Sequence, residues 1–597
     1  MIREMLKNKW GPTLLVYVAI YLIVIFLDVR LGGFLSFYFN PVIFHYLSLI
    51  IIISLFYGVT NEWKKNTQIA KSLKHFDDVD QKENNRLYVI LLLIIFALGT
   101  FLRLYHLGEL SPAGDEYRHL LAMKRFLTDG IFGYTTSSIT TLIITGVKKI
   151  TTSDSLFLLR LPFALLGSLS ILLFYAIGKK IATRQVGLIA AYLFAFLPLA
   201  VGLSNYIRGY EIALFVSLVA IYFLFSPYIK NLYFKIVLFI LSLKLIAYLN
   251  SDQRFDAMVM FFAIFALFYG GLMFIDEIIK NKRWNNIIKI TAPFIAFVAG
   301  ISIMPLFFEF SFSRTVEWGY LFLINHSYSD VTWYFEIIPF IVIIFFIISA
   351  FFAKIKKKNV IYALSFTLIF IIAIFMFYFD GPKRFQVRYL YPLFPYFILL
   401  LSIGISSAYY IFKRIFKVGI IEYSIVSVIV FITIFSPVKA FYFTFTETNG
   451  EHSKLNQLTY LPDKELITFV NAHNIDVSKI ITTTPWVFDF YYDQPFLMTG
   501  ELNQYVHFPK EWNYEFVNRT KLYSISGFRS EEEIKTINEI IDTRDIEYLI
   551  FHSLPQHSDY RYSYEYPLET IRDTELVTII GENSSYGYYI YKINKES

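Results

Sequence analysis

Long apolar stretches separated by short polar segments dominate the first 440 residues of the chain. Stretches such as 87–102 and 341–352 contain no charged residue. About 20 consecutive apolar residues are enough for a helix to cross a bilayer. The pattern therefore predicts a mainly α-helical polytopic membrane protein with about 13 transmembrane helices. The predicted spans lie near 11–30, 41–58, 88–106, 156–177, 186–203, 210–227, 234–250, 256–275, 288–307, 335–353, 360–379, 391–411 and 419–437.

The pattern changes after about residue 438, where the chain becomes polar and rich in tyrosine and turn residues. Helical patterns at 463–473 and 531–542 alternate with β-like runs at 479–484, 548–552, 576–580 and 588–593. Alternation of helices and strands is typical of a small α/β domain. The sequence therefore predicts that residues 438–597 form a soluble α/β domain.

Positive charges orient this arrangement, because Lys and Arg concentrate in the short cytoplasmic loops of membrane proteins. Arg3, Lys7 and Lys9 precede the first span and place the N-terminus in the cytoplasm. Further basic clusters all fall on the same side: 64–74, 179–184, 230–235, 280–283, 354–358 and 413–417. An odd number of spans then places the tail outside, together with the long loops 107–155 and 308–334.

Three regions follow from this topology. Residues 1–87 form an N-terminal transmembrane hairpin and a cytoplasmic loop, 88–437 a transmembrane core, and 438–597 the extracytoplasmic α/β domain. No cleavable signal peptide is expected, because the first apolar stretch has full spanning length. The chain is predicted to lie in the plasma (inner) membrane as a multi-pass protein.

Composition agrees with this organisation. Hydrophobic residues make up 56% of the chain and the mean hydropathy is +0.52, which argues against a soluble multidomain protein. The absence of cysteine excludes disulfides, thiolate catalysis and a Cys-ligated metal, and favours a prokaryotic source. The cytoplasmic clusters explain the net charge of +7, so no nucleic-acid partner is expected. Membrane lipids are the expected partners of these clusters.

The first candidate for chemistry is the acidic pair Asp115 and Glu116, which follows the span 88–106 on the outer side. Charged groups near a membrane core are costly and are often functional. A carboxylate here could take a proton from an acceptor hydroxyl or amine. The alternative is an acidic group that only stabilises the N-terminus of a helix.

The second candidate is the segment 204–211, between two predicted spans. Arg208 could bind a phosphate group through charge-assisted hydrogen bonds, and Glu211 lies at the head of the next helix. The alternative is an interfacial loop in which the arginine and the glutamate pair with each other.

The third candidate is the basic segment 380–395, which lies outside, against the positive-inside trend. Its cations are Lys383, Arg384 and Arg388. An anionic substrate would explain them, and contact with anionic lipid headgroups is the alternative. Asp252 and Arg254, in another outer loop, are weaker candidates.

No His, Asp or Glu cluster has the spacing of a metal site, and no Gly-rich phosphate loop is present. The sequence leaves open whether a divalent cation assists, and no other cofactor is expected. Nucleotide sugars and ATP are cytoplasmic, whereas a polyprenyl-phosphate sugar is an anionic, membrane-resident donor that suits an outer site.

Four segments, in order and spacing, resemble the C-type glycosyltransferase superfamily, and most of all its protein O-mannosyltransferase and lipid A aminoarabinose transferase branch. They cover about residues 88–440 and are these: Phe101–Tyr105 followed by Asp115-Glu116; Arg160–Gly167 running on to Tyr175–Gly178; Ala190–Pro198 with Ser204–Glu211; and Arg388–Pro395.

The resemblance implies a reaction and residue roles. A sugar would pass from a polyprenyl-phosphate donor to an extracytoplasmic acceptor (a protein, a glycolipid or a surface polymer) with inversion at the anomeric carbon. Asp115 matches the acid taken as general base or acceptor-positioning group, Glu116 its neighbour, and Glu211 a second functional acid. The donor phosphate would contact Arg208 and Arg388, and the remaining candidates are Lys383, Arg384 and Arg254 for the phosphate and Arg118, Tyr210, Tyr389 and Asp252 for the substrate pocket.

The chain also departs from the family pattern. The first outer loop carries residues 133–138, Gly-Tyr-Thr-Thr-Ser-Ser, where relatives often carry His-Pro-Pro or Lys-Pro-Pro. A phosphate-binding lysine is therefore missing, and Lys383 or Arg384 would substitute. Two other functions stay open: a transporter or flippase of lipid-linked sugars, and a non-catalytic surface scaffold.

Overall fold

The computed structural model describes the region of the chain that carries the first outer loop, its neighbouring helices and much of the tail. The described residues are 85–130, 138–225, 350, 360–361, 364, 391, 394–415, 437–449, 451–453, 455, 458–482, 484–492, 541, 545–553, 574–581 and 586–594.

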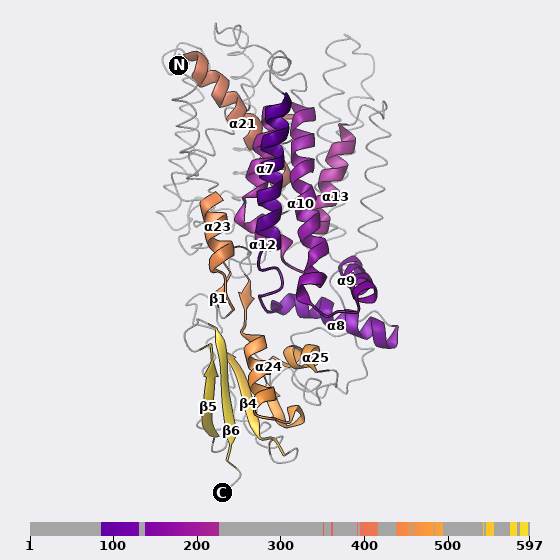
Figure 1. The fold of residues 1–597 in the computed structure, drawn as a ribbon, viewed down its shortest axis with the longest axis vertical. Coiled ribbons are helices and arrows are strands. Elements are labelled where there is room, and N and C mark those ends of the chain that lie inside the picture. Colours follow the sequence, from indigo (N-terminus) through magenta and orange to yellow (C-terminus); the bar gives the residue numbers. More distant parts are fainter. Residues whose placement is uncertain are drawn as a thin grey trace, which may run out of the picture.

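Apolar helices stand side by side and form the upper body in Figure 1. They are α7 (Asn85–Leu104), α10 (Leu156–Ile181), α11 (Arg184–Ala195), α12 (Pro198–Ser204), α13 (Gly209–Leu224) and α21 (Phe394–Ile415). Among the described residues, Arg86–Leu104 and Leu156–Ile181 are long and apolar enough to cross a membrane. Apolar helices therefore occupy the predicted spans 88–106, 156–177, 186–203, 210–227 and 391–411.

The remaining predictions for the membrane region lie wholly or mostly outside the described residues. They are the spans 11–30, 41–58, 234–250, 256–275, 288–307, 335–353, 360–379 and 419–437, the N-terminal hairpin and cytoplasmic loop (residues 1–87) and the outer loop 308–334. The number of spans and the domain boundaries therefore stay predictions.

The predicted span 186–203 is a bent pair of helices, with an angle of 64° between α11 and α12. Pro198 is the first residue of α12, and Leu197 before it has extended backbone angles. A proline lacks the N–H that would continue a preceding helix and pushes the residue before it out of helical geometry. After the bend, Ser204 at the end of α12 contacts Arg103 of α7 and Gly167 of α10.

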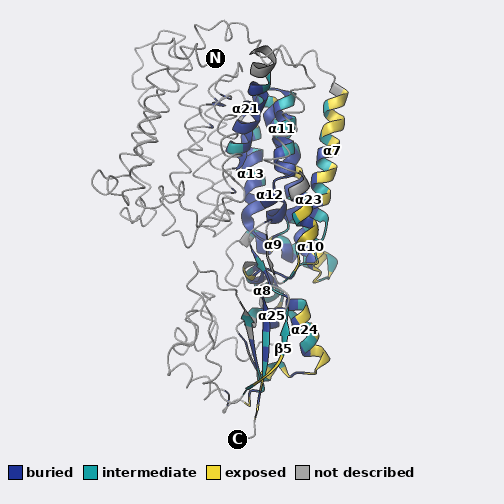
Figure 2. Cartoon of the chain, turned by 90° about the vertical axis from the view of Figure 1, so that its left-hand side faces the viewer, coloured by how far each residue is buried: buried dark blue, intermediate teal, exposed yellow. Residues whose placement is uncertain are grey.

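Glycines allow close packing between α10 and α11. A Cβ added at Gly187 would lie 2.4 Å from the carbonyl oxygen of Tyr175, and one at Gly178 would lie 2.8 Å from the Cα of Gly187. Helices in a membrane associate through such small residues, which let backbones approach. Figure 2 shows the result: α11, α13 and α21 are largely buried, whereas the outer face of α7 is exposed and apolar.

Two helices of the first outer loop lie across the lower ends of the apolar helices (Figure 1). They are α8 (Gly114–Asp129) and α9 (Ser138–Thr151). Helix α8 begins after the extended residue Ala113 and ends before Gly130, whose φ of 69° is the left-handed conformation common after a helix.

The described segments of the tail combine helices with a mixed sheet. Its helices are α23 (Pro437–Thr446), α24 (Asp463–Ala472), the short 3₁₀ helix Val477–Lys479 and α25 (Pro485–Tyr491). A short strand pair, β1 (Glu451–His452) and β2 (Thr459–Tyr460), is antiparallel. The larger sheet has the order β3-β4-β6-β5, from β3 (Ile480–Thr482), β4 (Tyr548–Ser553), β5 (Thr574–Ile580) and β6 (Gly587–Ile593).

Pairing in this sheet is parallel between β3 and β4 and antiparallel elsewhere, with a register shift between Leu576 and Thr578. Helix α24 and the four strands lie where the sequence predicts them. The predicted helix 531–542 lies outside the described residues except for Ile541. Helices α24 and α25 come between the sheet and α8 (Figure 1), so the tail meets the membrane region at the first outer loop.

Candidate functional site

The first turn of α8 carries the acidic pair that the sequence singles out. Asp115 is the second residue of the helix, and Glu116 follows with a fully buried side chain. Glu116 turns back on its own helix start, where its Oε2 accepts a hydrogen bond of 2.9 Å from the backbone N–H of Ala113. A carboxylate near the start of a helix satisfies N–H groups that have no partner within the helix.

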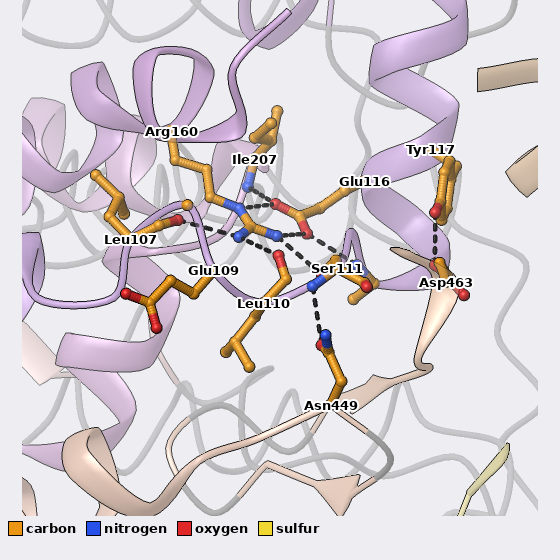
Figure 3. A network of polar contacts seen from close by, with 12 residues as sticks. Leu107, Glu109, Leu110, Ser111, Glu116, Tyr117, Arg160, Ile207, Asn449 and Asp463 are labelled. Atoms are coloured by element: carbon orange, nitrogen blue, oxygen red, sulfur yellow. Dashed lines mark hydrogen bonds and ion pairs between the residues drawn. The ribbon is translucent and has the colours of Figure 1, made fainter. Parts of the chain in front are cut away.

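Arg160, in α10, holds the same carboxylate from the other side (Figure 3). Its Nε donates to Glu116 Oε1 at 3.0 Å, and one terminal nitrogen donates to Glu116 Oε2 at 2.7 Å. Its other N–H groups donate to the carbonyl oxygens of Leu107, Leu110 and Ser111. All five N–H donors of the guanidinium are therefore bonded, and they fix the loop that leads from α7 to α8.

The loop between α12 and α13 is joined to this pair. The backbone N–H of Ile207 donates to Glu116 Oε1 at 2.9 Å. Asp115 precedes Glu116 and Arg208 follows Ile207, and consecutive Cα atoms lie about 3.8 Å apart. The acidic turn of α8 and the arginine that precedes α13 therefore lie close together at one end of the apolar helices.

Glu116 thus accepts four hydrogen bonds from the protein, two at each oxygen. An ionised carboxylate has about four acceptor positions. The sequence predicts a catalytic role for Glu116. These contacts instead favour a role in which it positions the loop.

Glu211 lies in a second buried cluster, within the apolar helices. Its Oε1 accepts from the hydroxyl of Ser204 at 2.8 Å and from that of Tyr391 at 2.5 Å. Its Oε2 is buried and has no hydrogen-bond donor among the described residues. Arg103 bonds the same serine hydroxyl at 3.1 Å and also donates to carbonyl oxygens of α7 and α11. An acid with an unoccupied oxygen beside a buried cation could receive a ligand group or a proton.

Gly167 makes room for this second cluster, because a Cβ there would lie 2.4 Å from Ser204 Oγ and 3.0 Å from Arg103 Nε. We expect Gly167→Ala to lower the stability by about 1–3 kcal/mol, as overpacking of a tight interior does. The control is Gly146→Ala in α9, where a Cβ meets nothing within 4 Å. Thermal unfolding in detergent compares the two, and equal midpoints would contradict the close packing.

Beside the acidic turn, a third cluster joins α8 to the tail. Asp463, the first residue of α24, accepts from Tyr117 at 2.5 Å through Oδ2 and from Tyr588 at 2.5 Å through Oδ1. Figure 3 shows the Tyr117–Asp463 pair next to the Glu116–Arg160 network. Burial raises the pKa of Asp463 to about 7, although the two tyrosine hydrogen bonds act in the opposite direction.

The structure brings several of the predicted site residues together. Glu116, Arg208 and Glu211 are buried, and Tyr210 is buried with its ring 6.5 Å from that of Tyr206. Arg118 is half-buried on α8, and Asp115 is described by its backbone in the first turn of that helix. Six predicted residues lie outside the described residues: Asp252, Arg254, Lys383, Arg384, Arg388 and Tyr389.

Sequence reasoning did not assign a role to Arg103, Arg160 or Asp463. The signal for both arginines was present, because each is a charge inside a predicted apolar span, at 88–106 and 156–177. Nothing in the spacing of the tail pointed to Asp463, since its tyrosine partners come from distant segments of the chain. Among the described residues, no three His, Asp or Glu side chains are grouped so that they could hold a metal ion.

Comparisons with known proteins add a likeness of fold. No protein-family profile and no curated protein matches the sequence. Two solved structures of the Archaeoglobus fulgidus oligosaccharyltransferase are similar. One, with an inhibitory peptide and a dolichol-phosphate, has a TM-score of 0.46 at 12% identity, covering 78% of this chain and 69% of that one. The other, tethered to an acceptor peptide, has a TM-score of 0.49 at 11% identity, and the match covers 85% of this chain and 74% of that one.

ArnT from Cupriavidus metallidurans, bound to undecaprenyl phosphate, is similar as well. Its TM-score is 0.45 at 10% identity, and the match covers 86% of this chain and 99% of that one. The chain is therefore similar to solved structures of two enzymes, at 10–12% identity. The resemblance expected from the sequence is thus found among solved structures, while TM-scores below 0.5 leave the function to be argued from this chain's own residues.

Proposed function

We propose that this chain is an integral membrane glycosyltransferase that moves a sugar from a polyprenyl-phosphate donor to an extracytoplasmic acceptor. One observation carries the proposal: the buried Glu116–Arg160 pair ties the turn of Asp115 to the loop of Arg208. An acid that can accept a proton and a cation that can bind a phosphate are thereby held at one end of the apolar helices. A lipid-linked anionic donor would enter this place from the membrane.

The reaction assigns a task to each group. Asp115 accepts the proton of an acceptor hydroxyl or amine while that group attacks the anomeric carbon of the sugar. The bond between the anomeric carbon and the phosphate oxygen breaks, and the polyprenyl phosphate leaves with the electron pair. Arg208 stabilises the charge that develops on the leaving phosphate. Attack opposite the leaving group inverts the configuration at the anomeric carbon.

The neighbouring groups prepare this step. Glu116 and Arg160 position the loop that carries Asp115, and Glu211 offers its second carboxyl oxygen as the second functional acid. Lys383, Arg384, Arg388 and Arg254 are proposed as additional phosphate contacts, and Arg118, Tyr210, Tyr389 and Asp252 as the substrate pocket. The acceptor is a protein, a glycolipid or a surface polymer.

The membrane arrangement belongs to the same proposal. Residues 88–437 form the transmembrane core in the plasma membrane of a prokaryotic cell, and the tail 438–597 lies on the outer side with the first outer loop. Apolar helices at five of the predicted spans support the membrane location. The contacts between the tail and α8 support the proposal that the tail and the acidic turn lie on the same side of the membrane.

The test is a donor screen with the purified protein in lipid. Polyprenyl-phosphate monosaccharides are offered one by one, with and without extracted envelope acceptors, and each reaction is followed by mass spectrometry. We expect one donor to be converted to polyprenyl phosphate, with the sugar recovered on an acceptor or as the free sugar. A folded protein that binds polyprenyl phosphates yet converts no donor would contradict the proposal and favour a transporter of lipid-linked sugars.

A further inference from the structure

The tail contacts the first outer loop on both sides of the acidic turn. Before the turn, the Lys464 ammonium donates to the carbonyl oxygens of Gly108 and Glu109, both at 3.0 Å. After the turn, Tyr117 donates to Asp463 at 2.5 Å. Asp463 and Lys464 are consecutive residues at the start of α24, so one helix start binds both flanks of the segment that carries Asp115.

Further contacts extend this attachment along α8 and its preceding loop. The Asn449 side chain accepts from the backbone N–H of Ser111 at 2.9 Å. Lys124 lies two turns after Tyr117 in α8. Its ammonium group donates to the carbonyl oxygen of Phe490 in α25 at 2.6 Å and lies 5.3 Å from the centre of the Phe490 ring. The tail therefore binds the loop and α8 at points from residue 108 to residue 124.

Asp463 is the central residue of this attachment. Its side chain is buried, with 1% exposed, and each carboxyl oxygen accepts a hydrogen bond from a tyrosine hydroxyl. Tyr588 belongs to β6, so the carboxyl group connects the sheet of the tail to α8. Buried polar groups with all partners present hold one arrangement and tolerate little displacement.

We propose that the start of α24 is a clamp that positions the Asp115 turn, with Asp463 and Lys464 as positioning residues of the sugar-transfer reaction. The inference rests on the proposed function and gives the tail a role in it. Chemistry at a bound substrate is sensitive to small shifts of the reacting group, and a displacement of about 1 Å can cost 10²-fold in rate. Loosening the clamp therefore lowers turnover without removing any group that touches the substrate.

The clamp also has an expected pH dependence. The groups that face Asp463 are Tyr117 of α8, Tyr588 of β6, Tyr491 of α25 and Glu465 of its own helix. Because the pKa of Asp463 is raised from 3.8 to about 7, docking favours the protonated carboxyl group. The stability that this group contributes is present below about pH 4 and is lost as the pH rises through about 7. Asp463→Ala, which cannot titrate and accepts no hydrogen bond, removes this dependence together with the contact.

The test combines hydrogen exchange with kinetics. The variants are Asp463→Ala, Tyr117→Phe, their double variant and Lys464→Ala. The control is Lys479→Ala, which removes ion pairs to Asp545 and Glu547 within the tail. Exchange of amides 108–117 is measured over the pH range, and kcat and KM are measured with the donor found in the screen.

We expect faster exchange of amides 108–117 and a kcat lowered about tenfold to hundredfold in each clamp variant, with little change in donor KM. The Asp463→Ala and Tyr117→Phe effects should not multiply, because each removes the hydrogen bond between these two residues. The control should match the wild type. Unchanged exchange would overturn the clamp, and faster exchange with an unchanged kcat would overturn its positioning role. Exchange is read without turnover, so an inactive wild type would count against the proposed function alone.

Discussion

Asp115→Asn is expected to lower kcat by about 10²- to 10⁴-fold, the range over which a positioned general base acts. The amide has nearly the same size as the carboxyl group but cannot accept the acceptor's proton. Donor KM should change little, because the phosphate is bound by cations on other segments. Initial rates at several donor concentrations separate the two constants.

The matched control is Asp154→Asn in the same outer loop. Asp154 is 52% exposed and pairs with Lys148 at the surface, away from the Glu116–Arg160 network. Surface ion pairs contribute about 0–1 kcal/mol, so this variant should keep wild-type turnover and stability. Equal turnover of both variants would rule out Asp115 as the base.

Arg160→Met is expected to destabilise the protein by about 3–5 kcal/mol, the usual cost of leaving one member of a buried ion pair without its partner. The substitution leaves Glu116 charged and buried, and it removes the donors to three backbone carbonyl groups of the loop 107–111. Chemical or thermal unfolding in detergent measures the loss. Turnover should fall as well, because the Asp115 turn loses its support.

Arg160→Lys separates charge from geometry at this position. A lysine keeps the positive charge but has at most three donors and cannot form the planar fork that meets both carboxylate oxygens. We expect most of the destabilisation to remain. Lys148→Met, which removes only a surface ion pair, serves as the control. An Arg160→Met variant that is as stable as this control would contradict the structural role of the pair.

Several elements of the fold were accessible from the sequence because one simple pattern determines each of them. Long, mostly apolar runs located α7 and α10, and β-like runs in the tail located β4 and β6. The bend between α11 and α12 was not predicted, although Pro198 marks it, because the run remains apolar across the break. Helix α25 was missed because it is short and rich in aromatic residues, which fit a strand or a helix equally well.

The site was only partly accessible. The sequence singled out Asp115, Glu116, Arg208 and Glu211 because charged groups near a membrane span are costly and are often functional. It could not show that Glu116 is bonded on every side, since its partners come from α10 and from the loop before α13. The Asp463 clamp was inaccessible for the same reason: its hydrogen bonds join residues separated by 346 and 125 positions.

The most direct test of the central claim follows both products of a single reaction in reconstituted vesicles. The donor identified in the screen is placed in the bilayer, the acceptor is supplied on the side of the tail, and polyprenyl phosphate and glycosylated acceptor are measured together. Transfer predicts that the two products appear in equal amounts and that both are lost with Asp115→Asn. Donor that reaches the other leaflet intact, with no release of polyprenyl phosphate and no effect of Asp115→Asn, would contradict it.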